Sequence, residues 1–378
     1  MNSLICSDAI AFYRRTLSRF YVTADALELS PVERAVGLLE PLHPQVVASL
    51  DEIPNEHRNL RSIFVTSFRG EPLAPCPGTR LHQCCNYHTV DLYAGCPLGC
   101  SYCIMQSYRE RTPVTVYADP APAIAAIRRQ ALDAPDRILR VGTGETGDSL
   151  LYDPLFDVTR RYIVELADLP NVHFEAKTKT DWVDHLLSVE PKGNAVIGFS
   201  LNADEASAEE GKSAPLARRL AAAVRAVAAG YRVAVHFDPL FRLGDLNQTE
   251  THYASVVARL AAAVPAERIA WISLGTVRYP PALRDHIHRP YMLDEFVVGV
   301  DGKYRYLQRE RVAIYQAVVR TLCSALAPVP PIYLCMESEA VWRRVFGATP
   351  QSIPALSAIF DGAFVRGVER SERREEEG

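Results

Sequence analysis

From residue 89 onward, short apolar runs alternate with longer stretches in which apolar residues recur at helical spacing. The apolar runs predict β-strands over 89–94, 137–142, 172–178, 195–201, 232–238 and 268–275. The stretches between them predict helices over 120–132, 153–169, 214–230 and 249–264. Six strand–helix units of this length favour an α/β fold, with a parallel sheet wound as a partial (β/α)6 barrel of the TIM type or as a complete barrel. A doubly wound open sheet is the alternative.

The segments on either side of this repeat predict additions to the barrel. Residues 1–60 read as helices with polar breaks, followed by a strand over 61–68 and a loop over 70–88. After the repeat, 306–326 predicts an amphipathic helix and 331–337 a short strand. The expected parts are an N-terminal extension of helices and a Cys-containing loop (1–87), the barrel (88–300), a C-terminal helix and strand packing on it (301–365), and a charged, disordered tail (366–378).

The composition favours a soluble, cytoplasmic protein. The 378 residues are 48% hydrophobic, enough for a packed core, and contain no apolar run of the roughly 20 residues that span a membrane. The N-terminus lacks the layout of a signal peptide. A formal net charge of −4 provides no overall basic field for nucleic acid. Nine cysteines in an odd, clustered arrangement are more typical of metal binding or catalysis than of secreted disulfides.

Three of these cysteines lie close together. In YAGCPLGCSYCIMQSY (93–108), Cys96, Cys100 and Cys103 have the spacing C-x3-C-x2-C. They follow directly on the first predicted strand, and chemistry in β/α barrels lies on the loops after the strands. A proline and a glycine between them suit a chain that turns tightly around a ligand. The cluster is therefore expected at a functional edge of the barrel.

Three interpretations of this cluster are open. Ordinary buried cysteines would form a poor core pattern on a loop that contains Gly and Pro. A structural zinc ion needs four ligands, and Cys84 or Cys85 could supply the fourth. An iron–sulfur cluster is usually held by four thiolates, so a [4Fe–4S] cluster on three would leave one iron open to a substrate or cofactor. The spacing favours this last interpretation, with Cys76, Cys84 and Cys85 packing in the loop near the cluster.

The motif C-x3-C-x2-C at this place resembles the signature of the radical SAM superfamily. The resemblance implies a [4Fe–4S] cluster on the three cysteines, with S-adenosylmethionine (SAM) bound at the open iron. The sequence GTGE (142–145) after the second strand resembles the acidic, Gly-rich motif that holds the SAM amino group. Gly144 and Glu145 are therefore candidates for binding SAM. Ile104 matches the position whose side chain packs near the adenine.

Nearly the whole chain resembles the spore photoproduct lyase family in its wider sense, through CPGT…CCNY, CSYCIMQSY, EAKTKT, FSLN, SLGTVRYP and YLCMES…VW. The resemblance implies that a Lys after strand three and a Ser after strand four contact the SAM carboxylate. Here these are Lys179, with Lys177 as the alternative, and Ser200. Tyr102 matches one of the tyrosines that relay the radical. Arg278, after strand six, is a candidate for binding an anionic group of SAM or substrate.

The resemblance implies an enzyme that reductively cleaves SAM to a 5′-deoxyadenosyl radical, which abstracts hydrogen from a DNA lesion or another substrate. The expected partners are SAM, an electron donor such as flavodoxin or ferredoxin, and DNA as one candidate. One departure puts the substrate in doubt, because the repair lyase carries a hydrogen-donating cysteine where this chain has Gly142. The alternative function is a non-catalytic iron–sulfur or zinc protein that senses redox state or binds nucleic acid.

Overall fold

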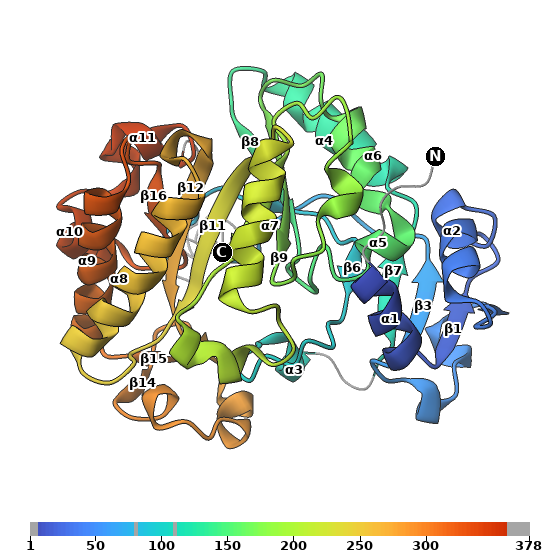
Figure 1. Ribbon diagram of the computed structural model, residues 1–378, viewed down its shortest axis with the longest axis horizontal. Helices are drawn as coiled ribbons and strands as arrows, with labels where there is room; N and C mark the ends of the chain where they lie inside the picture. The colour runs from blue at the N-terminus through green and yellow to red at the C-terminus, as the bar shows by residue number, and fades with distance from the viewer. Residues whose placement is uncertain (1–6, 79–81, 109–111, 361–378) are drawn as a thin grey trace, which may run out of the picture.

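The computed structural model describes residues 7–78, 82–108 and 112–360. Within these residues, the main sheet is an eight-stranded half-barrel whose parallel strands follow one another in chain order (Figure 1). Across the sheet the strands are β16 (Ile332–Leu334), β12 (Ile269–Thr276), β11 (Arg232–Leu240), β10 (Val196–Ser200), β9 (Val172–Thr178), β8 (Leu139–Thr143), β5 (His88–Thr89) and the antiparallel β4 (Ala74–Pro75). The α/β class and the partial barrel are confirmed. The doubly wound alternative is wrong, because the order of the parallel strands never reverses.

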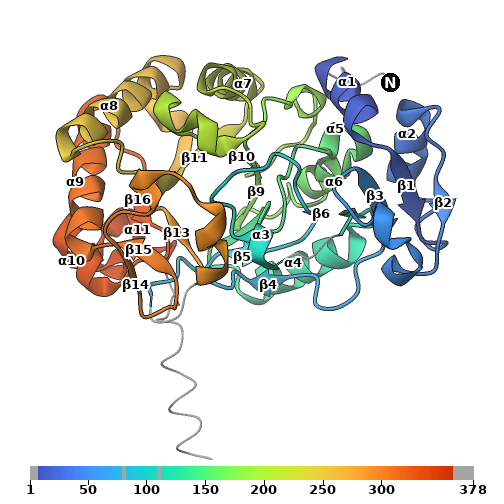
Figure 2. The same ribbon diagram turned by 90° about the horizontal axis from the view of Figure 1, so that it is seen from below.

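Helices surround the half-barrel on its outer side (Figure 2). Four match predicted helices closely: α4 (Ala121–Asp133), α7 (Leu216–Ala228), α8 (Leu246–Ala263) and α9 (Gln308–Ala325). The helix predicted over 153–169 is instead divided into α5 (Asp153–Phe156) and α6 (Val158–Glu165). The division lies at Asp157, whose φ is 54°. The buried Asp153 carboxylate there accepts from the Tyr93 hydroxyl at 2.7 Å, so tertiary contacts override the helical pattern of this segment.

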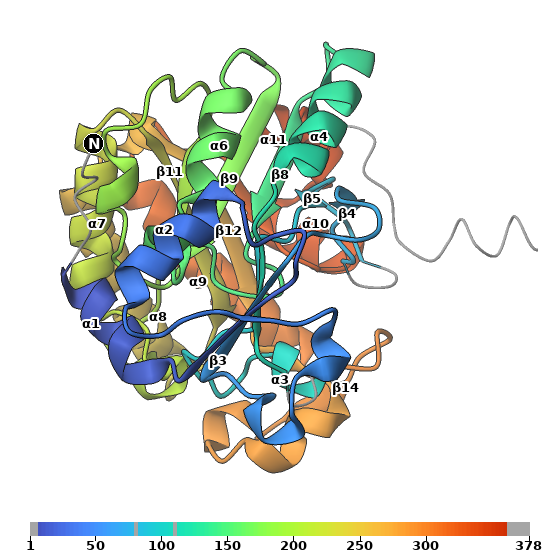
Figure 3. The same ribbon diagram turned by 90° about the vertical axis from the view of Figure 1, so that its right-hand side faces the viewer.

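A second, five-stranded sheet lies beside the half-barrel (Figure 3). Its strands, in order, are β2 (Gln45–Val46), β1 (Arg19–Val22), β3 (Ser62–Thr66), β7 (Val114–Tyr117) and β6 (Tyr93–Ala94). The strand predicted over 61–68 is confirmed. The expectation of helices alone over 1–60 is wrong, because β1 separates α1 (Ser7–Thr16) from α2 (Ser30–Leu39). The buried part of β1 is a three-residue run, Phe-Tyr-Val, too short to show the period of a strand.

The strand predicted over 89–94 divides between the two sheets. The Val90 amide still donates to Gly142 O of the half-barrel at 3.0 Å, whereas Leu92 O accepts from Tyr117 N of the second sheet, also at 3.0 Å. The chain therefore changes sheets within three residues. As a result, the segment that carries the cysteines starts from the edge of the second sheet and not from a barrel strand.

The C-terminal part adds a small antiparallel sheet and two helices. The sheet consists of β13 (Arg278–Tyr279), β15 (Tyr304–Tyr306) and β14 (Phe296–Val298), which the sequence pattern did not predict. We call this region the 278–306 module; it lies next to α3 (Met105–Tyr108), as Figure 2 shows. The predicted final helix and strand are confirmed as α9 and β16 and are followed by α10 (Glu339–Phe346) and α11 (Pro354–Ser357).

Two predictions from the sequence remain predictions. The charged tail predicted over 366–378 lies outside the described residues. The division into four parts stays a prediction, although the second sheet takes strands from both sides of residue 87. In the part of the chain that the structure describes, no helix has the length and apolar character needed to cross a membrane.

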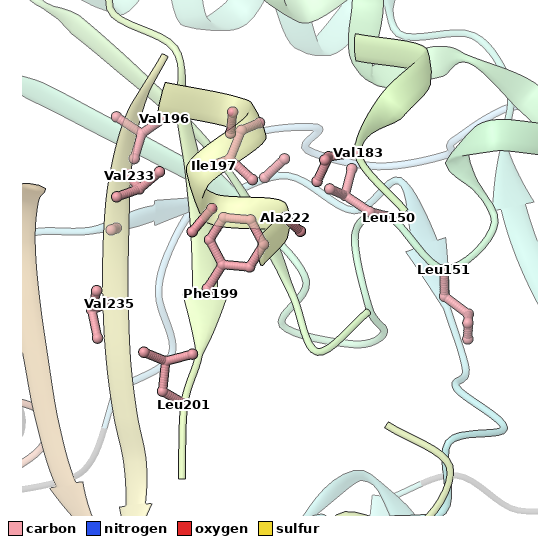
Figure 4. Close-up of a cluster of buried hydrophobic side chains, with 14 of the residues drawn as sticks. Leu150, Leu151, Val183, Val196, Ile197, Phe199, Leu201, Ala222, Val233 and Val235 are labelled. Carbon is pink, nitrogen blue, oxygen red and sulfur yellow. The ribbon is translucent and has the colours of Figure 1, made fainter. Parts of the chain in front are cut away.

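The two faces of the half-barrel differ in chemistry. Side chains that point toward the helices are apolar, as Figure 4 shows for Phe199 of β10 beside Ala222 of α7. The register places Val235 of β11 opposite Phe199, on the same face. The register places Ser200 opposite His236 and Gly142 opposite Glu175 on the other face. Successive residues of a strand alternate between the faces. The concave face is therefore polar, and it forms a site instead of a second apolar core.

We expect the apolar face to determine the stability of the barrel. Val235→Ala removes two methyl groups from a side chain that is 1% exposed, which should lower the free energy of unfolding by about 2 kcal/mol. The matched control is Val224→Ala on α7, where the side chain is 42% exposed and the change should stay within about 0.5 kcal/mol. Urea denaturation of both variants measures the difference. Equal losses would contradict this assignment of the core.

Candidate active site

The cysteine loop starts after β6 and ends at α3. Cys96, Cys100 and Cys103 all line one cavity of about 630 Å³. The opposite wall comes from the carboxyl ends of β8, β9, β10 and β11, which is where parallel barrels place their chemistry. Residues 58–60, from the N-terminal extension, complete the lining. The structure therefore brings the cysteine motif to the functional edge that the sequence predicts.

The spacing of the three thiols does not suit a single metal ion. Two thiolates bound to one zinc at about 2.3 Å lie about 3.8 Å apart. In the described residues, the group whose ligand atoms all lie within 4.8 Å of one another is Asp153, Asp157 and His185, and the cysteines form no such group. Neither Cys84 nor Cys85 lines the cavity as a fourth ligand. Three thiols that line one cavity fit an iron–sulfur cluster that is held by cysteines and leaves one iron open.

The three thiols lie in surroundings that disfavour the thiolate unless positive charge is added. Burial raises the pKa of Cys96, Cys100 and Cys103, and the Lys179 ammonium partly opposes this for the last two. A buried thiol becomes a thiolate readily only when positive charge is nearby. The iron of a cluster would supply that charge.

The loop after β8 forms a wall of the cavity with Gly144, Glu145 and Asp148. Gly144 has a φ of 89°, and a Cβ there would lie 2.7 Å from Ser149 Oγ. The Asp148 carboxylate accepts from Thr178 Oγ1 and from the Lys179 amide, both at 2.7 Å. These bonds fix the loop against the end of β9. The sequence did not single out Asp148, because an acidic residue in a turn after a strand is common.

Lys179 and Ser200 reach the cavity from the ends of β9 and β10. The Lys179 ammonium donates to Glu210 Oε1 at 3.0 Å and lies 5.7 Å from the centre of the Tyr102 ring. Tyr102 also lines the cavity, so three predicted residues meet there. Lys177 lines it as well. The two lysines differ in that Lys179 holds a buried carboxylate beside the cysteine loop.

Ile104 and Arg278, the two other predicted SAM-binding residues, lie outside the cavity lining. Neither belongs to the lining of the cavity, so their roles as SAM-binding residues stay predictions. Arg278 instead donates to Asp238 Oδ1 at 3.2 Å, and Asp238 does line the cavity. Burial alone would raise the pKa of Asp238, but Arg278 and Lys177 outweigh burial and lower it. The Arg278 guanidinium also lies 3.8 Å from the sulfur of Cys335, at the end of β16.

The segment after β10 supports the cysteine loop, and sequence reasoning missed it. Glu210 accepts from Lys179, from Arg219 and from the Tyr102 hydroxyl. Burial alone would raise the pKa of Glu210, but the two cations outweigh it and lower the pKa to about 2. At Gly211 a Cβ would lie 2.1 Å from Leu98 O of the cysteine loop. A pair of glutamates before a glycine reads as an exposed turn, and nothing in one sequence reveals this burial.

Gly142 makes room for a tyrosine. A Cβ at Gly142 would lie 1.5 Å from the Tyr87 hydroxyl oxygen, so any side chain there would overlap with the phenol. The Tyr87 hydroxyl donates to Glu175 Oε2 at 2.6 Å, and His236 Nε2 lies 2.5 Å from Glu175 Oε1. The Arg140 guanidinium packs over the Tyr87 ring at 5.1 Å. The place of the expected cysteine is thus occupied by a phenol that is held on a buried carboxylate.

Comparisons with known proteins identify the family of this chain. The model of the family described as spore photoproduct lyase matches residues 82–305, more than half of the chain. The spore photoproduct lyase of Bacillus subtilis (strain 168) is 26% identical over 253 residues, which cover 61% of this chain and 71% of that protein.

Solved structures share the fold. A mutant of spore photoproduct lyase with bound AdoMet and dinucleoside spore photoproduct superposes with a TM-score of 0.72 at 18% identity, covering 84% of this chain and 99% of that chain. Spore photoproduct lyase complexed with dinucleoside spore photoproduct gives 0.71 at 19% identity, covering 84% and 98%. Together with the family match, the half-barrel and its cysteine loop lead to one conclusion. The chain belongs to the spore photoproduct lyase family of radical SAM enzymes.

Proposed function

We propose that this chain binds a [4Fe–4S] cluster and SAM in the cavity behind the cysteine loop and uses them in a radical reaction on a DNA lesion or a related substrate. The observation that carries the proposal is the shared cavity. The three cysteines, Glu145, Lys179 and Ser200 come from separate segments and line the same space. AdoMet is bound in a solved relative that has this fold.

Each of these residues has a task that its chemistry suits. The cysteine thiolates would hold three irons of the cluster. Glu145 would accept hydrogen bonds from the SAM ammonium, while Lys179 and Ser200 would bind its carboxylate. When bound, the cluster supplies the electron that cleaves SAM to methionine and a 5′-deoxyadenosyl radical. The Lys179 ammonium lies over the face of the Tyr102 ring, and this cation–π contact would help to hold it in place.

The residues of the concave face indicate which substrate to test and how the reaction ends. Relatives bind a dinucleoside spore photoproduct, which makes a thymine-derived lesion the first substrate to test. We infer that the reaction of this chain ends differently, because Tyr87 fills the space beside Gly142 where the resemblance places a hydrogen-donating thiol. Cys335, held by Arg278 at the end of β16, is a thiol on the same concave side.

The proposed activity is tested on the anaerobically reconstituted protein, reduced with dithionite and supplied with SAM and a dinucleotide spore photoproduct. We expect 5′-deoxyadenosine, with slow conversion of the photoproduct and side products. No 5′-deoxyadenosine from cluster-loaded protein would support the non-catalytic iron–sulfur alternative. Rapid, clean return to two thymines, unchanged by Cys335→Ala, would refute the inference that the Gly142–Tyr87 pair alters the reaction.

The cluster ligands are tested by single replacements. Cys96→Ala, Cys100→Ala and Cys103→Ala should each abolish the brown absorbance and the iron and sulfide content of the anaerobic protein. Cys323→Ala is the matched control, since Cys323 is exposed on α9, and this variant should keep its full iron content. Stoichiometric zinc without iron in the unmodified protein would overturn the assignment.

SAM binding is tested by removing its charged partners. Lys179→Ala and Glu145→Ala should each weaken SAM binding roughly ten- to hundred-fold, since losing a charge-assisted hydrogen bond costs about 1.5–3 kcal/mol. Anaerobic equilibrium dialysis on cluster-loaded protein gives the affinity, and the iron content should not change. Lys192→Ala, in the turn before β10, is the control. A larger loss in Lys177→Ala than in Lys179→Ala would assign the carboxylate contact to Lys177.

A further inference from the structure

A single buried carboxylate connects the cysteine loop to the 278–306 module. Glu209 is 3% exposed and is the penultimate residue of the short 3-10 helical segment Asp204–Glu210 after β10. It accepts from Ser101 Oγ, which lies between two of the cysteines. It also accepts from Arg289 Nε at 2.8 Å and from the Tyr291 hydroxyl at 2.9 Å. A buried charge is stable only when it is paired in this way.

The backbone reinforces this connection. The Ser101 amide donates to Glu209 O at 2.9 Å, and the Lys212 amide donates to Leu98 O at 2.7 Å. The segment that holds the glutamate therefore runs along the cysteine loop and is bonded to it at two points. A movement of Glu209 would move the loop with it.

An aromatic row, which also includes Tyr291, links the same two regions. Phe241 packs edge-on against Tyr102 of the cysteine loop, with ring centres 5.5 Å apart. It packs in the same manner against Tyr291 of the module, at 5.7 Å. Edge-to-face pairs at these distances are attractive beyond the area that they bury. The module is thus in contact with the cysteine loop through a charged set and an aromatic set, at adjacent residues.

Arg289 and Glu209 differ in solvent exposure, and this difference shows which of them can be replaced with less effect on folding. The Arg289 side chain is 54% exposed, whereas that of Glu209 is 4% exposed. A surface arginine can be replaced without opening a cavity, so its effect on the loop can be measured in a folded protein.

We propose that Glu209, with Arg289 and Tyr291, is a positioning residue that holds the cysteine loop in the geometry the cluster requires. The proposal depends on the proposed function only in assuming that the loop binds the cluster. Since Arg289 and Tyr291 belong to the 278–306 module, the geometry of the cysteine loop depends on a region that the cysteine motif does not include. Glu209 itself does not line the cavity and so acts through Ser101.

Hydrogen–deuterium exchange on the full-length, metal-free protein tests this directly. Glu209→Gln should speed exchange of amides in the 95–104 segment about ten-fold, because the local opening no longer breaks charge-assisted bonds. Arg289→Ala and Tyr291→Phe should each give a smaller increase at the same amides. Arg284→Ala is the control on the same module, since the Arg284 guanidinium packs over Tyr304 at 4.8 Å; its 95–104 segment should exchange as in the unmodified protein.

The cluster-loaded protein gives a second measurement. Glu209→Gln and Arg289→Ala should lose iron to a chelator several-fold faster, and the double variant should show less than the sum of the two effects because they remove one contact. Unchanged exchange over 95–104 in both single variants would overturn the proposal, whatever the enzyme catalyses. If Glu209→Gln does not fold, Arg289→Ala and Tyr291→Phe decide alone. Faster exchange in a protein that never cleaves SAM would leave the positioning role standing and reject the proposed function.

Discussion

The burial of charge on the concave face of the half-barrel is the constraint on which the site depends. An open sheet whose inner face carries carboxylates and cations can fold only if each charge finds a partner there. The same requirement holds at the edge of the sheet for Glu210, on the segment after β10, which is 2% exposed and is held by Lys179, Arg219 and Tyr102. The same bonds that make its burial tolerable fix the lysine and the tyrosine beside the cysteine loop. Stability and preorganisation of the site therefore have one physical cause.

The sequence predicted those parts of the fold that have a regular period. The strands over 172–178 and 195–201 were placed within a residue, because each is a short run of strand-forming residues that follows turn signals, Pro-Asn before the first and Pro-Lys-Gly-Asn before the second. The 278–306 module was missed, because its strands have two or three residues each and show no period. The strand over 89–94 was divided for a tertiary reason. Its two halves pair with different sheets, and no local pattern indicates which partner a strand takes.

The candidate site shows the same division between local and non-local information. The cysteines, Glu145 and Ser200 were found because they form short motifs at predictable strand ends, and the structure places them around one cavity. Asp148 and Glu210 were not found, since their roles come from partners about 30 residues or more away. Each supports a residue that the motif did identify. Sequence reasoning thus recovered groups that line the cavity, whereas the groups that hold them in place required the structure.

Gly142 and Tyr87 show how the concave face can change while the cysteine loop is kept. A Cβ at Gly142 would lie 1.5 Å from the phenol oxygen of Tyr87, so the two positions cannot both carry a side chain in this space. Tyr87 in turn donates a hydrogen bond to Glu175. Burial alone would raise the pKa of Glu175, but His236 and Tyr87 outweigh burial and lower this pKa to about 2. None of these residues contributes to the lining beside the cysteines. The residues that would bind SAM are therefore a different set from Tyr87, Glu175 and His236. This separation allows the second set to vary while the first is retained.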